Sequence, residues 1–148
     1  MLLDPVRLIE HVHGHLGWLA AAILVHPAIV LRSRTRRAHL AVSMAAGLVT
    51  LAAGIGLWLY VAYRERLKQG IFQHAPAVGL LFERKEHLAF GAVVLAWAGT
   101  AAYFAAPRAT PPTRERLRTI AFRAFCASAA LTILVALLGT IVAVYRSF

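Results

Sequence analysis

A chain of 148 residues that is 60% hydrophobic, with a mean hydropathy of +0.68, has too few polar residues to cover a soluble domain. We therefore expect residues 1–148 to form one integral membrane domain. The net charge of +10 comes from Lys and Arg residues that gather between apolar segments, where they set membrane topology, so the pattern argues against nucleic-acid binding. The single Cys126 excludes an internal disulfide.

Four segments are long and apolar enough to span a bilayer, which takes about 20 helical residues. They lie near residues 12–31, 39–63, 87–106 and 119–144. Backbone polar groups in lipid must be hydrogen-bonded within each segment, so the spans are expected to be helices. Because sequential neighbours joined by short connections run antiparallel, the expected fold class is an all-α membrane protein, an antiparallel four-helix transmembrane bundle.

The connections differ in charge and length. Segments 32–37 and 107–118 are short and arginine-rich, whereas 64–86 is longer and reads as the least helical part of the chain. The two short turns and Arg123 together carry nine Lys and Arg residues, against seven in the rest of the chain. The positive-inside rule therefore predicts a protein of the bacterial inner membrane with both short turns in the cytoplasm and both termini in the periplasm.

Histidines are the main candidates for function, and residues 11–26 hold four of the seven. His15 and His26 are eleven residues apart, which is three helical turns plus about 20°, so they share one helix face about 16 Å apart along the axis. In an antiparallel bundle His87 lies at the same end as His15, and His39 at the same end as His26. The sequence therefore predicts an outer pair, His15 with His87, and an inner pair, His26 with His39.

On these four histidines the chain resembles the membrane-embedded b-type cytochromes, in which antiparallel helices hold one or two haems between histidine pairs at opposite membrane faces. The resemblance covers the whole chain in architecture. At residue level it rests on HGHLGWLAAAILVH with His15 and His26, RRAHLAVSM with His39, and RKEHLAFG with His87. Two departures from the family pattern are that His39 and His87 are expected at helix starts, and that Pro27 directly follows His26.

The resemblance implies one or two haem b groups, with His15, His87, His26 and His39 as ligands of the haem iron. It also implies electron transfer as part of a larger redox membrane complex, often with a quinone, rather than stand-alone catalysis. Basic residues next to the histidines could pair with the haem propionates or anchor the chain at the interface: Arg84, Lys85 and Arg36.

Two other functions stay open at this point. If HVHGH is extended, its alternate histidines, His11 and His13 with His15, point the same way and could bind copper, as in a metal chaperone or an oxidase assembly factor. A structural subunit of a membrane complex would need no cofactor. A hydrolase or transferase is not supported, because the sequence has no paired carboxylates within a span, no nucleophile elbow and no phosphate loop.

Overall fold

The computed structural model describes residues 5–33 and 38–145, and these residues contain no β-strand. Four of the helices are long and apolar enough to cross a membrane. In chain order the elements are α1 (Pro5–Arg32), α2 (His39–Arg66), the short α3 (Lys68–His74), α4 (Pro76–Ala105), the 3-10 turn η1 (Ala106–Arg108) and α5 (Pro111–Tyr145).

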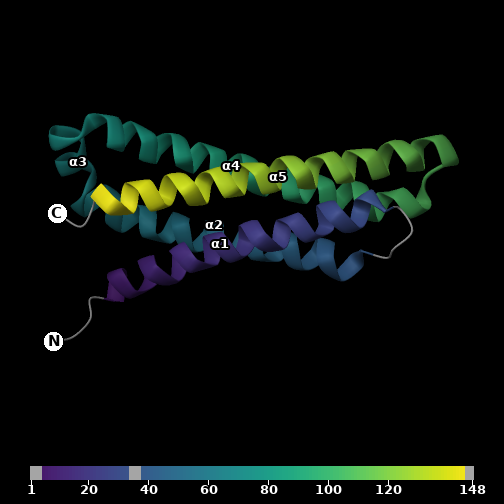
Figure 1. Ribbon diagram of the computed structural model, residues 1–148, viewed down its shortest axis with the longest axis horizontal. Helices are drawn as coiled ribbons and strands as arrows, with labels where there is room; N and C mark the ends of the chain where they lie inside the picture. Colours follow the sequence, from purple (N-terminus) through teal and green to yellow (C-terminus); the bar gives the residue numbers. More distant parts are fainter. Residues whose placement is uncertain (1–4, 34–37, 146–148) are drawn as a thin grey trace.

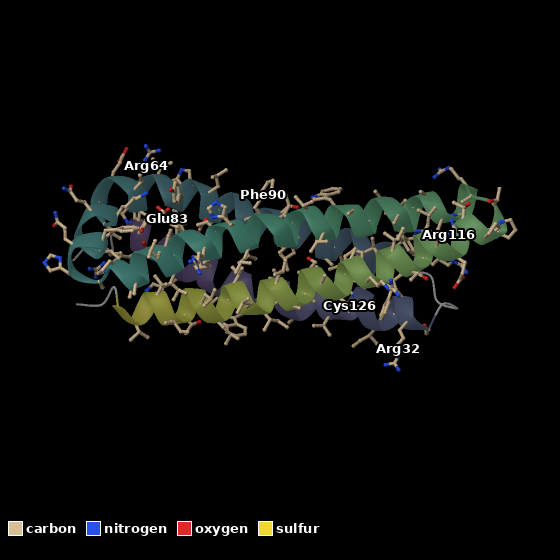
Figure 2. The ribbon with its side chains drawn as sticks, turned by 90° about the horizontal axis from the view of Figure 1, so that it is seen from above. Arg32, Arg64, Glu83, Phe90, Arg116 and Cys126 are labelled. Atoms are coloured by element: carbon tan, nitrogen blue, oxygen red, sulfur yellow. The ribbon has the colours of Figure 1, made fainter. Side chains whose placement is uncertain are left out.

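The four long helices form an antiparallel bundle, as predicted (Figure 1). Around the bundle, α1 packs on α2 and α5, and α4 packs on the same two helices. Within the described residues, α1 and α4 are therefore diagonal to each other, and no Cα atom of one lies within 8 Å of a Cα atom of the other. We call the end that holds α3 the α3 end and the opposite one the turn end. Figure 2 shows Arg64 and Glu83 near the α3 end, and Arg32 and Arg116 near the turn end.

Small side chains dominate the core of the bundle. Alanines make up most of the buried apolar residues, and the few large ones include Leu24, Val42 and Phe125. Helices in lipid gain little from the hydrophobic effect, so close approach over small residues and van der Waals contact hold them together. One close approach between α4 and α5 is at Gly99, where a Cβ atom would lie 3.0 Å from the Phe125 ring of α5.

Three hydrogen bonds connect neighbouring parts of the bundle. The Ser128 hydroxyl of α5 donates to the Ala92 carbonyl of α4 over 2.8 Å, and both residues are buried. The indole of Trp97 in α4 donates to the Thr50 hydroxyl of α2 over 2.9 Å. In addition, the Tyr103 hydroxyl accepts from the backbone N–H just before α2. Such bonds are worth about 0.6 kcal/mol each on average in membrane bundles, so they set register more than they stabilise.

The helices extend beyond the apolar segments. For this reason the prediction that segment 64–86 is the least helical part of the chain was wrong. Segment 64–86 is almost entirely helical, and α4 begins at Pro76, eleven residues before His87. Proline suits the first helical turn, and the polar residues that follow can lie at the interface while the helix continues. The length of an apolar segment therefore predicts which residues lie in the hydrocarbon, but it does not predict where the helix begins. His39 does begin α2, as expected.

Packing at Gly99 is testable with a matched glycine. Gly99→Leu forces an isobutyl group into the Phe125 ring and should destabilise the bundle by about 1–3 kcal/mol. Gly54→Leu in α2 is the control, because nothing lies within 4 Å of the position of its added Cβ. Thermal unfolding in detergent should show a lower midpoint for the first variant only. Equal midpoints would contradict the close α4–α5 contact.

Candidate functional site

Helix α1 has a buried face and an exposed face that both run along its length. Ala20, Ala21, Leu24 and Pro27 are buried against the bundle. On the opposite side lies a stripe that we call the histidine face, and all of its members are exposed: His11, His15, Trp18, Ala22, His26 and Ile29. His15 and His26 thus share one helix face, and that face points away from the rest of the chain.

The depth of this face makes its histidines unusual. A helix of 28 residues is about 42 Å long, whereas the hydrocarbon core is about 30 Å thick. If the core is centred on α1, His15 lies about 5 Å and His26 about 11 Å from the mid-plane, both inside the hydrocarbon. Neither side chain makes a hydrogen bond or ion pair with any residue that the structure describes. A polar ring facing lipid at this depth is costly unless something else covers it.

The predicted partner histidines lie on the side of the bundle formed by α2 and α4. His87 is exposed, and its Nδ1 atom lies 2.8 Å from the Glu83 carbonyl oxygen one turn earlier. It lines a shallow pocket of about 210 Å³ together with Leu57, Tyr60 and two glutamates of α4. His39 is exposed as well, and its ring lies edge-on to Tyr103 of α4 with 5.4 Å between the ring centroids.

One chain therefore places the histidines at the expected ends of the bundle but does not bring them together in pairs. His15 and His87 are on diagonal helices, and both are exposed. His26 faces outward from α1, while His39 packs on the aromatic residues of α4. Haem ligation by these residues stays a prediction, and within the described chain neither predicted pair is assembled around a common space.

His13 is the one histidine of the amino-terminal group that turns toward the interior. Its Cε1 atom would lie 2.9 Å from a Cβ atom added to Gly56 of α2, so the glycine makes space for the ring. Its Nδ1 atom is buried and has no hydrogen-bond partner in the described part of the chain. The helical spacing agrees with this orientation, because His13 precedes the buried Ala20 and Leu24 by seven and eleven residues and so shares their helix face.

The basic residues expected near a cofactor take different positions. Lys85 points into the bundle with its side chain 11% exposed, bonds to Glu86 over 3.2 Å, and lies 4.4 Å from the centre of the Phe82 ring. Arg84 is exposed, and Arg36 lies outside the described residues. Lys85 is therefore paired inside the protein and is not free to neutralise a ligand on the outside.

A second ion pair fixes the short helix at the α3 end. Lys68 of α3 donates to Glu83 of α4 over 2.5 Å, and this hydrogen bond raises the pKa of the Lys68 ammonium group. The bond ties α3 to α4 beside the pocket that His87 lines. The two side chains are 37% and 34% exposed, so water screens the ion pair and its effect on stability is small.

The copper alternative receives no support from the arrangement of HVHGH. The segment is helical, so His11 and His15 are exposed on the outer face while His13 turns inward. Among residues 5–33 and 38–145, no three His, Cys, Asp or Glu side chains are grouped so that they could hold a metal ion.

Comparison with known proteins adds no family to this description. No protein-family model, no curated protein and no solved structure matches the chain. The functional argument therefore depends on the physical placement of its own residues.

The contact between His13 and Gly56 can be measured by a double-mutant cycle. Gly56→Ala should lower the stability of the bundle by about 1 kcal/mol or more, because the new methyl group displaces the His13 ring. In a His13→Ala background the same change should cost nothing. Thermal unfolding of the four proteins should give a coupling energy of about 0.5–3 kcal/mol. Additive effects would show that the ring does not pack on the glycine.

Proposed function

We propose that the chain is a membrane electron-transfer protein of the b-type cytochrome kind that binds one or two haem b groups and works within a larger redox complex of the bacterial inner membrane. The observation that carries this proposal is the histidine face of α1. It presents two unpartnered imidazoles at hydrocarbon depth, about 16 Å apart along one helix.

Haem fits this face better than lipid does. A haem is flat and largely apolar, and its iron takes an imidazole nitrogen as axial ligand, which would satisfy His15 and His26 where lipid cannot. Ala22 lies between the two histidines on this face. Its small side chain leaves room for a macrocycle where Leu or Phe would fill it.

The protein would supply ligation, orientation and a low dielectric, and the haem would supply one-electron redox chemistry. Two ligand positions at different depths of one helix are suited to moving an electron across part of the membrane. A purely structural subunit would need no polar side chain at either position, so the histidine face favours the redox proposal.

The direct test is the absorption spectrum of the purified protein with matched histidine variants. Protein from haem-replete cells should give a reduced-minus-oxidised spectrum of the b type. His15→Ala and His26→Ala should each remove one haem, about half of the total where two are bound. His74→Ala is the control. His74 is exposed at the end of α3, and its ring bonds only to the Gly70 carbonyl oxygen within that helix. A colourless protein, or haem content that neither α1 variant changes, would overturn the proposal.

A further inference from the structure

A haem of the bis-histidine kind needs two axial histidines, and the histidine face of a single chain offers only one at each depth. The other exposed histidines of the membrane-spanning helices, His39 and His87, are on the α2–α4 side of the bundle. In the described structure neither residue faces α1, because His87 lies on the diagonal helix α4 and the His39 ring packs on Tyr103 and Phe104 of α4. The second ligand must therefore come from outside the chain.

A bis-histidine site needs both ligands at one depth in the membrane. His15 and His26 lie about 16 Å apart along α1, so a second copy has to offer a histidine at each of these two depths.

A dimer with its twofold axis along the membrane normal provides two histidines at the same depth, and one interface does so at both depths. It keeps both copies in the same orientation, so the two α1 helices run parallel and equivalent residues lie at equal depth. In such an interface a residue close to the axis faces its own equivalent. His15 then meets His15 of the second copy, and His26 meets His26 of the second copy, without any adjustment of register.

The remaining residues of the histidine face are compatible with this arrangement. His15, Ala22 and His26 lie within about 40° of one another around the helix, so all can face the axis together. The small side chain of Ala22 leaves space between the two helices. Trp18 and Ile29 are on the same face with 44% and 63% of their surface exposed, and they would bury apolar area against the second copy.

We infer that the chain functions as a parallel homodimer through the histidine face of α1, with each haem held between the same histidine of the two copies: His15 with His15, and His26 with His26. This inference depends on the proposed haem function and specifies the second ligand. It assigns no ligand role to His39 or His87.

Native mass spectrometry of the detergent-released protein tests the inference, because it counts chains and haems in the same particle. We expect two chains with two haems for the wild type, and two chains with one haem for either His15→Ala or His26→Ala. His87→Ala and His39→Ala should leave both counts unchanged. In mixed particles of one wild-type chain and one His15→Ala chain, isolated with two affinity tags, the bis-histidine haem at the outer position should be lost completely.

The contrary results separate this inference from the proposed function. Single chains that carry haem, or loss of a haem in His87→Ala or His39→Ala, would overturn the homodimer arrangement and leave a haem protein. Retention of half of the outer bis-histidine haem in the mixed particles would overturn it as well, because the wild-type chain would then hold its haem alone. Protein without haem in any oligomeric state would overturn both.

Discussion

The cost of leaving a polar group unpaired in lipid governs this structure at every level. It places the backbone of four long segments in helices, each of which satisfies its own hydrogen bonds. It also explains the hydroxyl and indole bonds between helices, such as that from Ser128 to Ala92, since each donor finds an acceptor inside the bundle. Lys85 follows the same rule, with its ammonium group paired to Glu86 beside the Phe82 ring. Helix α1 departs from this rule at the buried Nδ1 atom of His13 and along the exposed histidine face.

That departure gives the functional argument its weight. Small residues bring the helices together closely, and an internal cavity large enough for a macrocycle would have to replace contacts such as that between Gly99 and Phe125. The bundle interior is therefore occupied by the protein itself. The available ligand positions are on the outside of α1, where His15 and His26 have no partner in the described chain. In the proposed arrangement a cofactor at this surface would also form an interface, which would link ligand binding to assembly.

Much of the fold could be predicted from the sequence, since lipid imposes a strong and simple constraint. Four apolar segments and their short connections were enough to predict the antiparallel bundle and the end of the bundle at which each histidine lies. The start of α4 could not be predicted in this way, because a helix continues through polar residues once it leaves the hydrocarbon. The periodicity placed His15 and His26 on one face of α1, and the structure has them there. It did not say which way that face points. Helices that are apolar on all sides carry almost no amphipathic signal, so only the packing of Leu24 and its neighbours reveals that His13 turns inward and His15 outward.

Electron paramagnetic resonance of the oxidised protein tests the central claim, that the histidine face of α1 ligates haem iron, most directly. The account predicts a low-spin ferric signal of the bis-imidazole type in the wild type, and its complete loss in the double variant His15→Ala/His26→Ala. A low-spin bis-imidazole signal that survives in this double variant would contradict the account, because the ligands would then lie elsewhere in the protein.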